Sequence, residues 1–275
     1  MLTITYIYHS SFAIETDKCI LVFDYWKDPT GVMEKLVIDK AHKHFYVFAS
    51  HFHADHYNKE IFNWQRENPF TNYTYILSKD ILKHRKAKKE EADVWLAKGG
   101  CWEDENIKVI ATGSNDVGVS WIIEVDDKRI FHAGDLCNWY ARFLTESHYA
   151  NVNQDISSET KTTVNNRANE LVFSEEMGTY ISPVAEEKRF LGELKDIKKI
   201  SESFDIVMFP VDGRIGNGYT LGARQFIERF DVGLFVPMHF VMSGFESAWR
   251  MQPFCLQRDI SFWQISKEGD DITID

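Results

Sequence analysis

The chain has 275 residues, of which 44% are hydrophobic and 27% charged, and these values are typical of a soluble globular protein with a sizeable core. Its formal net charge of −11 argues against broad binding to nucleic acid, because phosphates require a basic surface. The sequence shows no apolar run near the roughly 18 residues of a membrane span, and no secretory signal precedes the first strand-like segment. We therefore expect a cytoplasmic protein without a membrane partner, and the scattered cysteines agree with a reducing compartment.

The first half of the chain predicts mainly short strands, because it is rich in β-branched and aromatic residues separated by polar turns. One helix is predicted among them over Lys79–Lys98, with Ser78 as its N-cap. The predicted strands are Thr3–Tyr8, Ser11–Glu15, Cys19–Asp24, Phe45–Ser50, Tyr73–Leu77, Ile107–Thr112, Val119–Val125 and Arg129–His132.

The second half alternates predicted helices with single buried strands. The helices are Glu186–Ser203, Thr220–Phe230 and Phe245–Leu256, and the strands are Asp205–Pro210 and Gly233–Pro237. This pattern fits two sheets with helices on their outer faces, in one α/β domain spanning residues 1–275. A polar segment at residues 138–184 has little periodicity and is interpreted as an insertion, either a functional lid or a mobile segment.

The pattern His51-x-His53-x-Asp55-His56 directly follows the apolar strand that ends at Ser50. Imidazole and carboxylate side chains are ligands suited to zinc, iron or manganese. In an extended segment the first two histidines point to one side and can bind one ion. A turn at Ala54 would let the other two side chains reach a second ion. A chance cluster is a poor alternative, because several residue types must recur at fixed offsets.

This pattern is the signature of the metallo-β-lactamase superfamily, which the chain resembles outside the 138–184 segment. The segments Tyr8–Phe12 and Leu21–Asp24 are similar to the branch that includes ascorbate-phosphate lactonases. Phe131–Asp135 and Val236–Phe240 resemble the later motifs that carry a bridging Asp and the last His. The resemblance implies an αββα four-layer sandwich with two metal ions at one edge between the sheets.

Carried over to this chain, the resemblance assigns His51, His53 and Asp135 to the first metal. It assigns Asp55, His56, Asp135 and His239 to the second. Zinc is the first expectation for both ions, with manganese or iron as alternatives. Asp24 is predicted to accept a hydrogen bond from a metal-bound imidazole.

One departure concerns a third histidine that the family usually supplies to the first metal from the loop before Val119. This loop contains no histidine. Asp116 could take that place, Ser114 or Asn115 could reach the metal, or the first site could lack a ligand. An oxygen donor would favour manganese or iron.

Two further residues are candidates for roles around the metals. His9, at the first strand turn, is a candidate proton carrier or substrate contact. Arg214, in a glycine-rich loop after a buried strand, could hold an anionic group through a bidentate contact. His132 is expected to be packed rather than catalytic.

These residues predict a metal-dependent hydrolase acting on a small molecule. Two metals can lower the pKa of a bridging water to about 7, and the resulting hydroxide would cleave an ester, lactone or phosphoester bond. Asp55 would orient this hydroxide or accept its proton. The alternatives are a phosphodiesterase or nuclease of the same fold and a metal-binding homologue without hydrolytic activity. The oligomeric state is left open.

Overall fold

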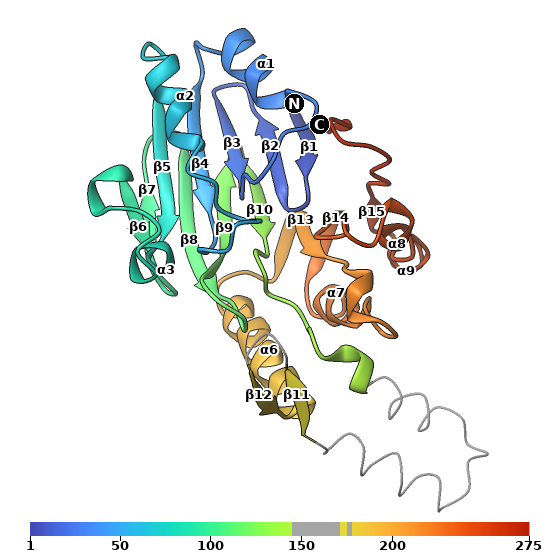
Figure 1. The fold of residues 1–275 in the computed structure, drawn as a ribbon. Coiled ribbons are helices and arrows are strands. Elements are labelled where there is room, and N and C mark those ends of the chain that lie inside the picture. Colours follow the sequence, from blue (N-terminus) through green and yellow to red (C-terminus); the bar gives the residue numbers. More distant parts are fainter. Residues whose placement is uncertain (145–170, 175–177, 275) are drawn as a thin grey trace, which may run out of the picture.

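Two seven-stranded sheets pack face to face in the computed structural model, which describes residues 1–144, 171–174 and 178–274 (Figure 1). The first sheet has the order β16-β1-β2-β3-β4-β5-β6, and the second has the order β15-β14-β13-β10-β9-β8-β7. The strands of the first sheet are β1 (Leu2–Tyr8), β2 (Ser11–Glu15), β3 (Cys19–Phe23), β4 (His44–Ala49), β5 (Tyr73–Ser78), β6 (Val94–Leu96) and β16 (Asp271–Ile274). Those of the second are β7 (Cys101–Glu103), β8 (Ile107–Gly113), β9 (Val119–Val125), β10 (Lys128–His132), β13 (Ser203–Pro210), β14 (Asp231–Met238) and β15 (Ser261–Phe262).

Helices cover the outer faces of both sheets and complete four layers (Figure 1). The helices are α1 (Val32–Asp39), α2 (Ile61–Glu67), α3 (Lys79–Lys83), α6 (Pro183–Lys198), α7 (Leu221–Ile227), α8 (Phe245–Trp249) and α9 (Gln252–Leu256), with short 3-10 turns η1 (Lys89–Glu91) and η2 (Gly213–Ile215). None of the helices in the described part of the chain is long and apolar enough to cross a membrane.

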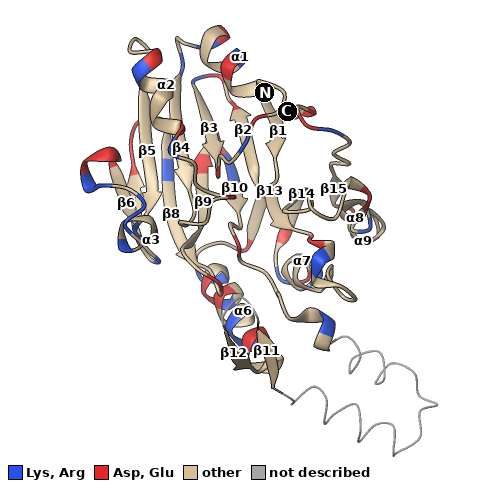
Figure 2. Cartoon of the chain, in the orientation of Figure 1, with Lys and Arg blue, Asp and Glu red and all other residues tan. Residues whose placement is uncertain are grey.

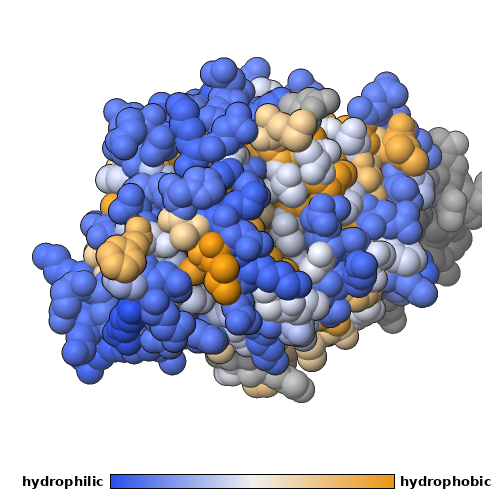
Figure 3. All heavy atoms as spheres, turned by 90° about the horizontal axis from the view of Figure 1, so that it is seen from above, coloured by the Kyte–Doolittle hydropathy of each residue, from blue (hydrophilic) through white to orange (hydrophobic). Residues whose placement is uncertain are grey.

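Apolar side chains fill the space between the layers. Between the two sheets, the rings of Phe48 and Trp121 lie 5.7 Å apart. On the outer face of the first sheet, Phe62 of α2 packs on Tyr75 of β5. Charged residues lie mostly on the helices and loops, with a few on the strands (Figure 2). Viewed from the α1 end, the surface is mostly hydrophilic with apolar side chains scattered over it (Figure 3). This arrangement confirms the predicted αββα sandwich.

Two predicted helices are wrong in extent. The predicted helix Lys79–Lys98 is only the short α3, capped by Ser78 as predicted, and the chain then returns to the sheet as β6. Tertiary contacts override the local helix preference here. The Asp93 carboxylate accepts the backbone N–H of Tyr75, and the next residues pair with β5 as the parallel strand β6. The predicted helix Phe245–Leu256 is divided into α8 and α9.

Only the ends of the predicted insertion at residues 138–184 can be compared with the structure. Residues 145–170 and 175–177 lie outside the described residues. The described ends include a hairpin of β11 (Val172–Ser174) and β12 (Thr179–Ile181), followed by the start of α6.

Candidate metal centre

Polar residues follow parallel strands of both sheets at the point where each strand ends. In the first sheet Asp24 follows β3 and His51 comes just after β4, which pair in parallel. In the second sheet Asp135, Asp212 and His239 come just after β10, β13 and β14, which also run parallel. Carboxyl ends of parallel strands lie at the same edge of a sheet, and ligands of α/β proteins bind there. The two sheets therefore bring these side chains to one end of the sandwich.

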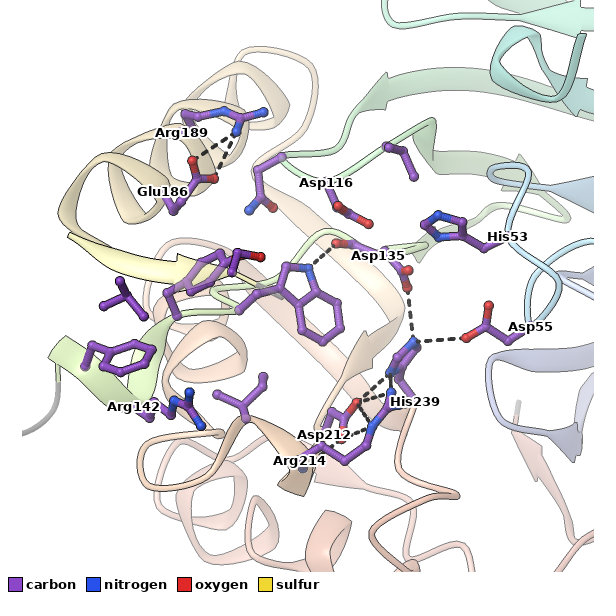
Figure 4. A pocket seen from close by; sticks show the side chains of 18 of the residues that line it. His53, Asp55, Asp116, Asp135, Arg142, Glu186, Arg189, Asp212, Arg214 and His239 are labelled. Atoms are coloured by element: carbon purple, nitrogen blue, oxygen red, sulfur yellow. Dashed lines mark hydrogen bonds and ion pairs between the residues drawn. The ribbon is translucent and has the colours of Figure 1, made fainter. Parts of the chain in front are cut away.

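A tight turn compacts the histidine-rich loop after β4. The carbonyl of His53 accepts the backbone N–H groups of His56 and Tyr57 at 3.1 and 2.9 Å. This turn, predicted at Ala54, brings the ring of His56 to within 4.2 Å of the ring of His51. His53 and Asp55 lie on either side of the turn and line one pocket (Figure 4).

The first donor group consists of His51, His53 and Asp135, whose ligand atoms all lie within 4.8 Å of one another. Nε2 of His51 is 3.1 Å from Nδ1 of His53 and 3.2 Å from Oδ2 of Asp135. Donors bound at about 2.0–2.2 Å from one ion lie roughly 2.9–3.5 Å apart at tetrahedral or octahedral angles. The spacing therefore suits one metal ion.

The second group consists of His9, Asp55, His56 and His239. The other carboxylate oxygen of Asp135, Oδ1, lies 3.0 Å from Nε2 of His56 and 3.3 Å from Nε2 of His239. Nε2 of His9 is 3.4 Å from Oδ2 of Asp55. Asp135 thus presents one oxygen to each group, which is the arrangement of a carboxylate that bridges two cations.

Several inward-facing atoms of these groups are buried without a hydrogen-bond partner in the described part of the chain. They are Nε2 of His9, His56 and His239 and Oδ1 of Asp135. Buried polar groups are nearly always hydrogen-bonded, and each unsatisfied one costs about 1–3 kcal/mol. Metal ions placed between these atoms would satisfy all of them, so the residues fit a metal centre.

The outer nitrogens of three imidazoles are held by hydrogen bonds. Asp24 accepts from His56 Nδ1 at 2.7 Å, and Asp212 accepts from His239 Nδ1 at 2.9 Å. The Ser50 hydroxyl lies 2.9 Å from Nδ1 of His51 and donates to Asp24. These contacts aim Nε2 of each ring at the centre, as outer partners of metal-binding histidines do.

The pKa values follow from burial and from these contacts. Burial alone would raise the pKa of Asp135, but the imidazoles of His56, His239 and His51 hold it well below its ordinary range. Burial also opposes ionisation of Asp212, yet hydrogen bonds from His239 and Arg214 lower its pKa to about 2. Burial lowers the pKa of His9 to about 4, against the opposing effect of Asp55. The carboxylates are therefore charged and His9 is neutral at pH 7.

Three site residues have strained backbones. His9, Asp24 and His239 have φ angles of 57°, 44° and 64°, a left-handed conformation that costs a non-glycine residue on the order of 1–3 kcal/mol. The backbone N–H of His239 donates to the carbonyl of His9 at 3.1 Å, and that of His9 donates to the Tyr6 hydroxyl at 2.8 Å. Surrounding hydrogen bonds thus hold both histidines in place.

Gly118 allows the loop before β9 to approach the histidine-rich loop. Its φ is 69°, and a Cβ at this position would overlap the carbonyl oxygen of Ser50. The neighbouring N–H of Val119 donates to the same oxygen at 3.1 Å. A glycine is therefore required where the two loops meet.

A cavity of about 1110 Å³ opens beside the donor groups. His53, Asp55, Asp135 and His239 line one end of it (Figure 4). Trp139 lines it as well, with its indole N–H donating to the Asp135 carbonyl at 2.8 Å and its ring 5.2 Å from that of His239.

Sequence reasoning missed Asp212 and Trp139. Asp212 directly follows a predicted buried strand, as Asp24 does, and this position was a signal for it. Trp139 falls in the predicted insertion, where no local pattern marks it.

The loop before β9 was expected to supply a ligand in place of the third histidine, and its three candidate residues lie in different surroundings. Asp116 is exposed and lines the cavity, but within the described chain it does not belong to either donor group. Ser114 accepts the backbone N–H of Asp116 at 3.2 Å. Asn115 is buried with both ends of its amide bonded to the backbone of Cys137, so this alternative ligand is already engaged elsewhere.

The remaining candidates are placed as follows. His9 is only 1% exposed and reaches Asp55, and it is absent from the described wall of the cavity. Arg214 lines the cavity, with Nε and one terminal nitrogen bound to Asp212. His132 is fully buried, stacked on Phe23, and within 3.0 Å of the Ser10 carbonyl, so it is packed as predicted.

The chain was compared with family models, curated protein sequences and solved structures. A family model described as a beta-lactamase superfamily domain matches residues 3–152. A search of curated protein sequences returned no match.

Solved structures of this fold align over nearly the whole chain. Igni18, a metallo hydrolase from Ignicoccus hospitalis, aligns with a TM-score of 0.62 and 15% identity, covering 100% of this chain and 98% of its own. The metallo-β-lactamase fold protein YhfI from Bacillus subtilis gives 0.58 and 12%, covering 99% and 100%. An isothiocyanate hydrolase from Delia radicum gut bacteria gives 0.50 and 11%, covering 99% and 98%. At such identities the likeness shows a common fold.

Proposed function

We propose that this chain, which belongs to the metallo-β-lactamase superfamily, is a hydrolase that uses two metal ions to cleave an ester, lactone or phosphoester bond of a small molecule. The observation that carries the proposal is the convergence of donor atoms from separate loops on Asp135, whose two oxygens face different groups. A structural ion site would be closed by its ligands, whereas this one borders a large cavity.

The proposed ligands follow the two donor groups. His51, His53 and Asp135 would hold one ion, and Asp55, His56, Asp135 and His239 the other. Zinc is the first choice because imidazoles predominate, and manganese or iron remain alternatives because carboxylate oxygens contribute. We assign His9 to the second group as an additional donor, in place of proton carrier, because its ring is buried behind Asp55.

The ions would supply an activated water and stabilise the negative charge that develops on the attacked group. The chain's own residues do the rest. The Asp55 carboxylate borders the cavity, and although burial opposes its ionisation, His9 and His56 hold its pKa below the ordinary range. Its place at the cavity, rather than its pKa, makes Asp55 the candidate that orients the attacking water or accepts its proton. Asp24 and Asp212 keep the imidazoles aimed inward, and Trp139 covers His239.

Asp116 remains a proposed ligand for the first ion. Figure 4 shows it on the same side of the cavity as His53 and Asp135. A bridging water or a rotated side chain would link it to the ion.

The missing third histidine also favours a second candidate, a metal-binding homologue without turnover. The first donor group has only three ligands, so its ion would be held less tightly than the second.

One experiment separates these candidates. Metal-free protein is reloaded with zinc, manganese or iron, its metal content is measured, and it is tested on esters, lactones, bis-p-nitrophenyl phosphate and an isothiocyanate. Isothiocyanate is included because a hydrolase of that compound shares the fold. We expect about two ions per chain and hydrolysis that Asp135→Asn abolishes, since that substitution weakens both groups.

Asp196 of α6, a half-buried residue that pairs with Lys199, provides a matched control. Asp196→Asn should keep both metal content and activity. Two bound ions without turnover on any substrate would favour the inactive homologue. Fewer than one bound ion with every metal would contradict the proposal.

A further inference from the structure

The cavity beside the donor groups has an apolar wall. Its aromatic and aliphatic lining residues are Trp139, Tyr140, Phe143, Val172, Phe173 and Ile215. They come from the segment after β10, from β11 and from η2, so three separate segments build one surface. A wall of this kind is suited to a flat or branched apolar group, because such contacts bury area without leaving polar atoms unpaired.

Arg142 lies at the far end of this cavity. In Figure 4 it is on the opposite side of the pocket from His53 and Asp55. Its guanidinium lies 4.4 Å from the ring centre of Phe143, and its stem passes along Gly216, 3.6 Å from where a Cβ would be. The guanidinium has a planar set of five N–H donors and can bind a carboxylate or phosphoryl group in addition to other contacts.

The charge of the cavity changes with metal loading. Three arginines and five carboxylates line it, a formal charge of −2 that two divalent ions would change to +2. The loaded cavity would therefore attract an anion, with Arg142 marking the end away from the ions.

We propose that the substrate is an elongated organic anion with an aromatic body. Its hydrolysable bond would lie at the donor groups, its body on the Trp139–Phe173 wall, and its carboxylate or phosphoryl group at Arg142. Arg142 is then the residue that selects for the anionic end. This inference rests on the proposed function for the place of the hydrolysable bond, but its binding features can be tested without turnover.

Calorimetric titration of the zinc-loaded protein tests the anionic end. The probes are biphenyl-4-carboxylate, biphenyl-4-phosphonate and neutral biphenyl-4-carboxamide. We expect at least one of the two anions to bind about tenfold more tightly than the amide, which is the effect of one charge-assisted hydrogen-bonded pair. The tighter anion shows whether the natural group is a carboxylate or a phosphoryl group.

Arg142→Gln should reduce the preference for the anion over the neutral amide to less than about threefold in affinity. The matched control is Arg258→Gln, because Arg258 also stacks on a phenylalanine, 3.6 Å from the ring centre of Phe254, away from the described lining of the cavity. Arg258→Gln should keep the full preference. If the preference survives in Arg142→Gln, the anion binds the metals instead and the proposal is wrong. Equal binding of all three probes by the unmodified protein would also overturn it.

The apolar wall has its own pair of variants. Phe173 lines the cavity, and its ring partner Tyr180, 5.2 Å away on β12, does not appear among the described lining residues. Phe173→Ser should lower the binding affinity for the anions and for the amide alike by about fivefold, because apolar contact is lost. Tyr180→Ser should have little effect. Equal effects of the two substitutions would contradict a role for the wall.

These results separate the inference from the proposed function. Selective binding that depends on Arg142 and Phe173, in a protein that hydrolyses nothing, would support the ligand class and refute the hydrolase. Hydrolysis of short neutral esters without any preference for aromatic anions would support the hydrolase and refute the ligand class.

Discussion

Asp212 controls the orientation of His239 through a single hydrogen bond of 2.9 Å to Nδ1. The same carboxylate is anchored by Arg214, so it has little freedom to follow a rotating ring. Because metal binding requires Nε2 of His239 to face Asp135, this outer contact determines whether the donor is correctly aimed.

We expect Asp212→Asn to lower metal affinity by about 10–100-fold while leaving the fold intact. An amide can still fill the space, but it interacts more weakly with the imidazole N–H and with Arg214. Chelator competition measures the affinity, and circular dichroism checks the fold. Asp196→Asn serves again as the control, and equal affinities in all three proteins would contradict the role of Asp212.

The sequence alone predicts the roles of some residues of the candidate site but not of others. Four donors between His51 and His56 were predictable because their spacing is local and unusual. Asp212 was marked only by its position after a predicted strand, and Trp139 was not marked at all, because its role arises from contacts between distant loops. The same holds for Asn115, whose bonds to Cys137 appear only when the two loops meet.

At the scale of elements, contacts between loops depend on Gly118. We expect Gly118→Ala to destabilise the protein considerably more than the roughly 1–2 kcal/mol of a strained left-handed residue, because the added methyl would push on Ser50 and the neighbouring donor loop. It should also lower metal affinity. Urea unfolding and chelator competition measure the two effects.

Gly99→Ala is the matched control for this substitution. Gly99 has a φ of 84° but no atoms within 4 Å of an added Cβ. It should therefore show only the cost of backbone strain. Similar losses in the two variants would mean that the close approach to Ser50 is unimportant.

The turn between β7 and β8 depends on the charge of Asp104. Its carboxylate accepts the N–H groups of Asn106 and Ile107 and the hydroxyl of Tyr46. Burial raises its pKa, but these hydrogen bonds outweigh burial and hold the pKa below the ordinary value. A lowered folded-state pKa means that the stabilisation is complete above the unfolded pKa of about 3.9 and is lost as the pH falls through the folded value.

We therefore expect Asp104→Asn to be destabilising at pH 7 and progressively less so below about pH 4. Urea unfolding of both proteins over this range, with chelator present throughout so that metal release does not contribute, measures the difference. A stability difference that does not change with pH would exclude the charge of Asp104 as its cause.

Most elements were predictable because alternation of apolar residues and polar turns is a local signal. The strands β2 and β9 have the predicted bounds, and α6 was found within a few residues of its ends. The helix predicted over Lys79–Lys98 failed because helix-favouring charged residues surround a short apolar strand. Only pairing with β5 reveals that Val94–Leu96 belongs to the sheet.

For the whole molecule, we expect the donor groups to make stability depend on metal. Among the residues that the structure describes, several buried nitrogens and a carboxylate oxygen of these groups have no hydrogen-bond partner. Binding at 100 times the dissociation constant stabilises a folded protein by about 2.7 kcal/mol per site. For a chain of this size we expect zinc to raise the melting temperature of the metal-free protein by roughly 5–10 °C per site.

Calorimetric melting with and without each metal measures this shift. Asp135→Asn should lose most of it, whereas Asp196→Asn should retain it. An identical melting temperature with and without every metal would contradict a metal centre at this position.

The backbone link between His9 and His239 joins the first strand turn to the end of β14. We expect residues so distant in sequence to meet late in folding, because closing long loops is entropically costly. A growing chain could hold a cation loosely at the His51–His56 loop, but the full cage would form only after β14 docks. Tight metal uptake would then report that folding is finished, and a truncated or stalled chain would remain inactive.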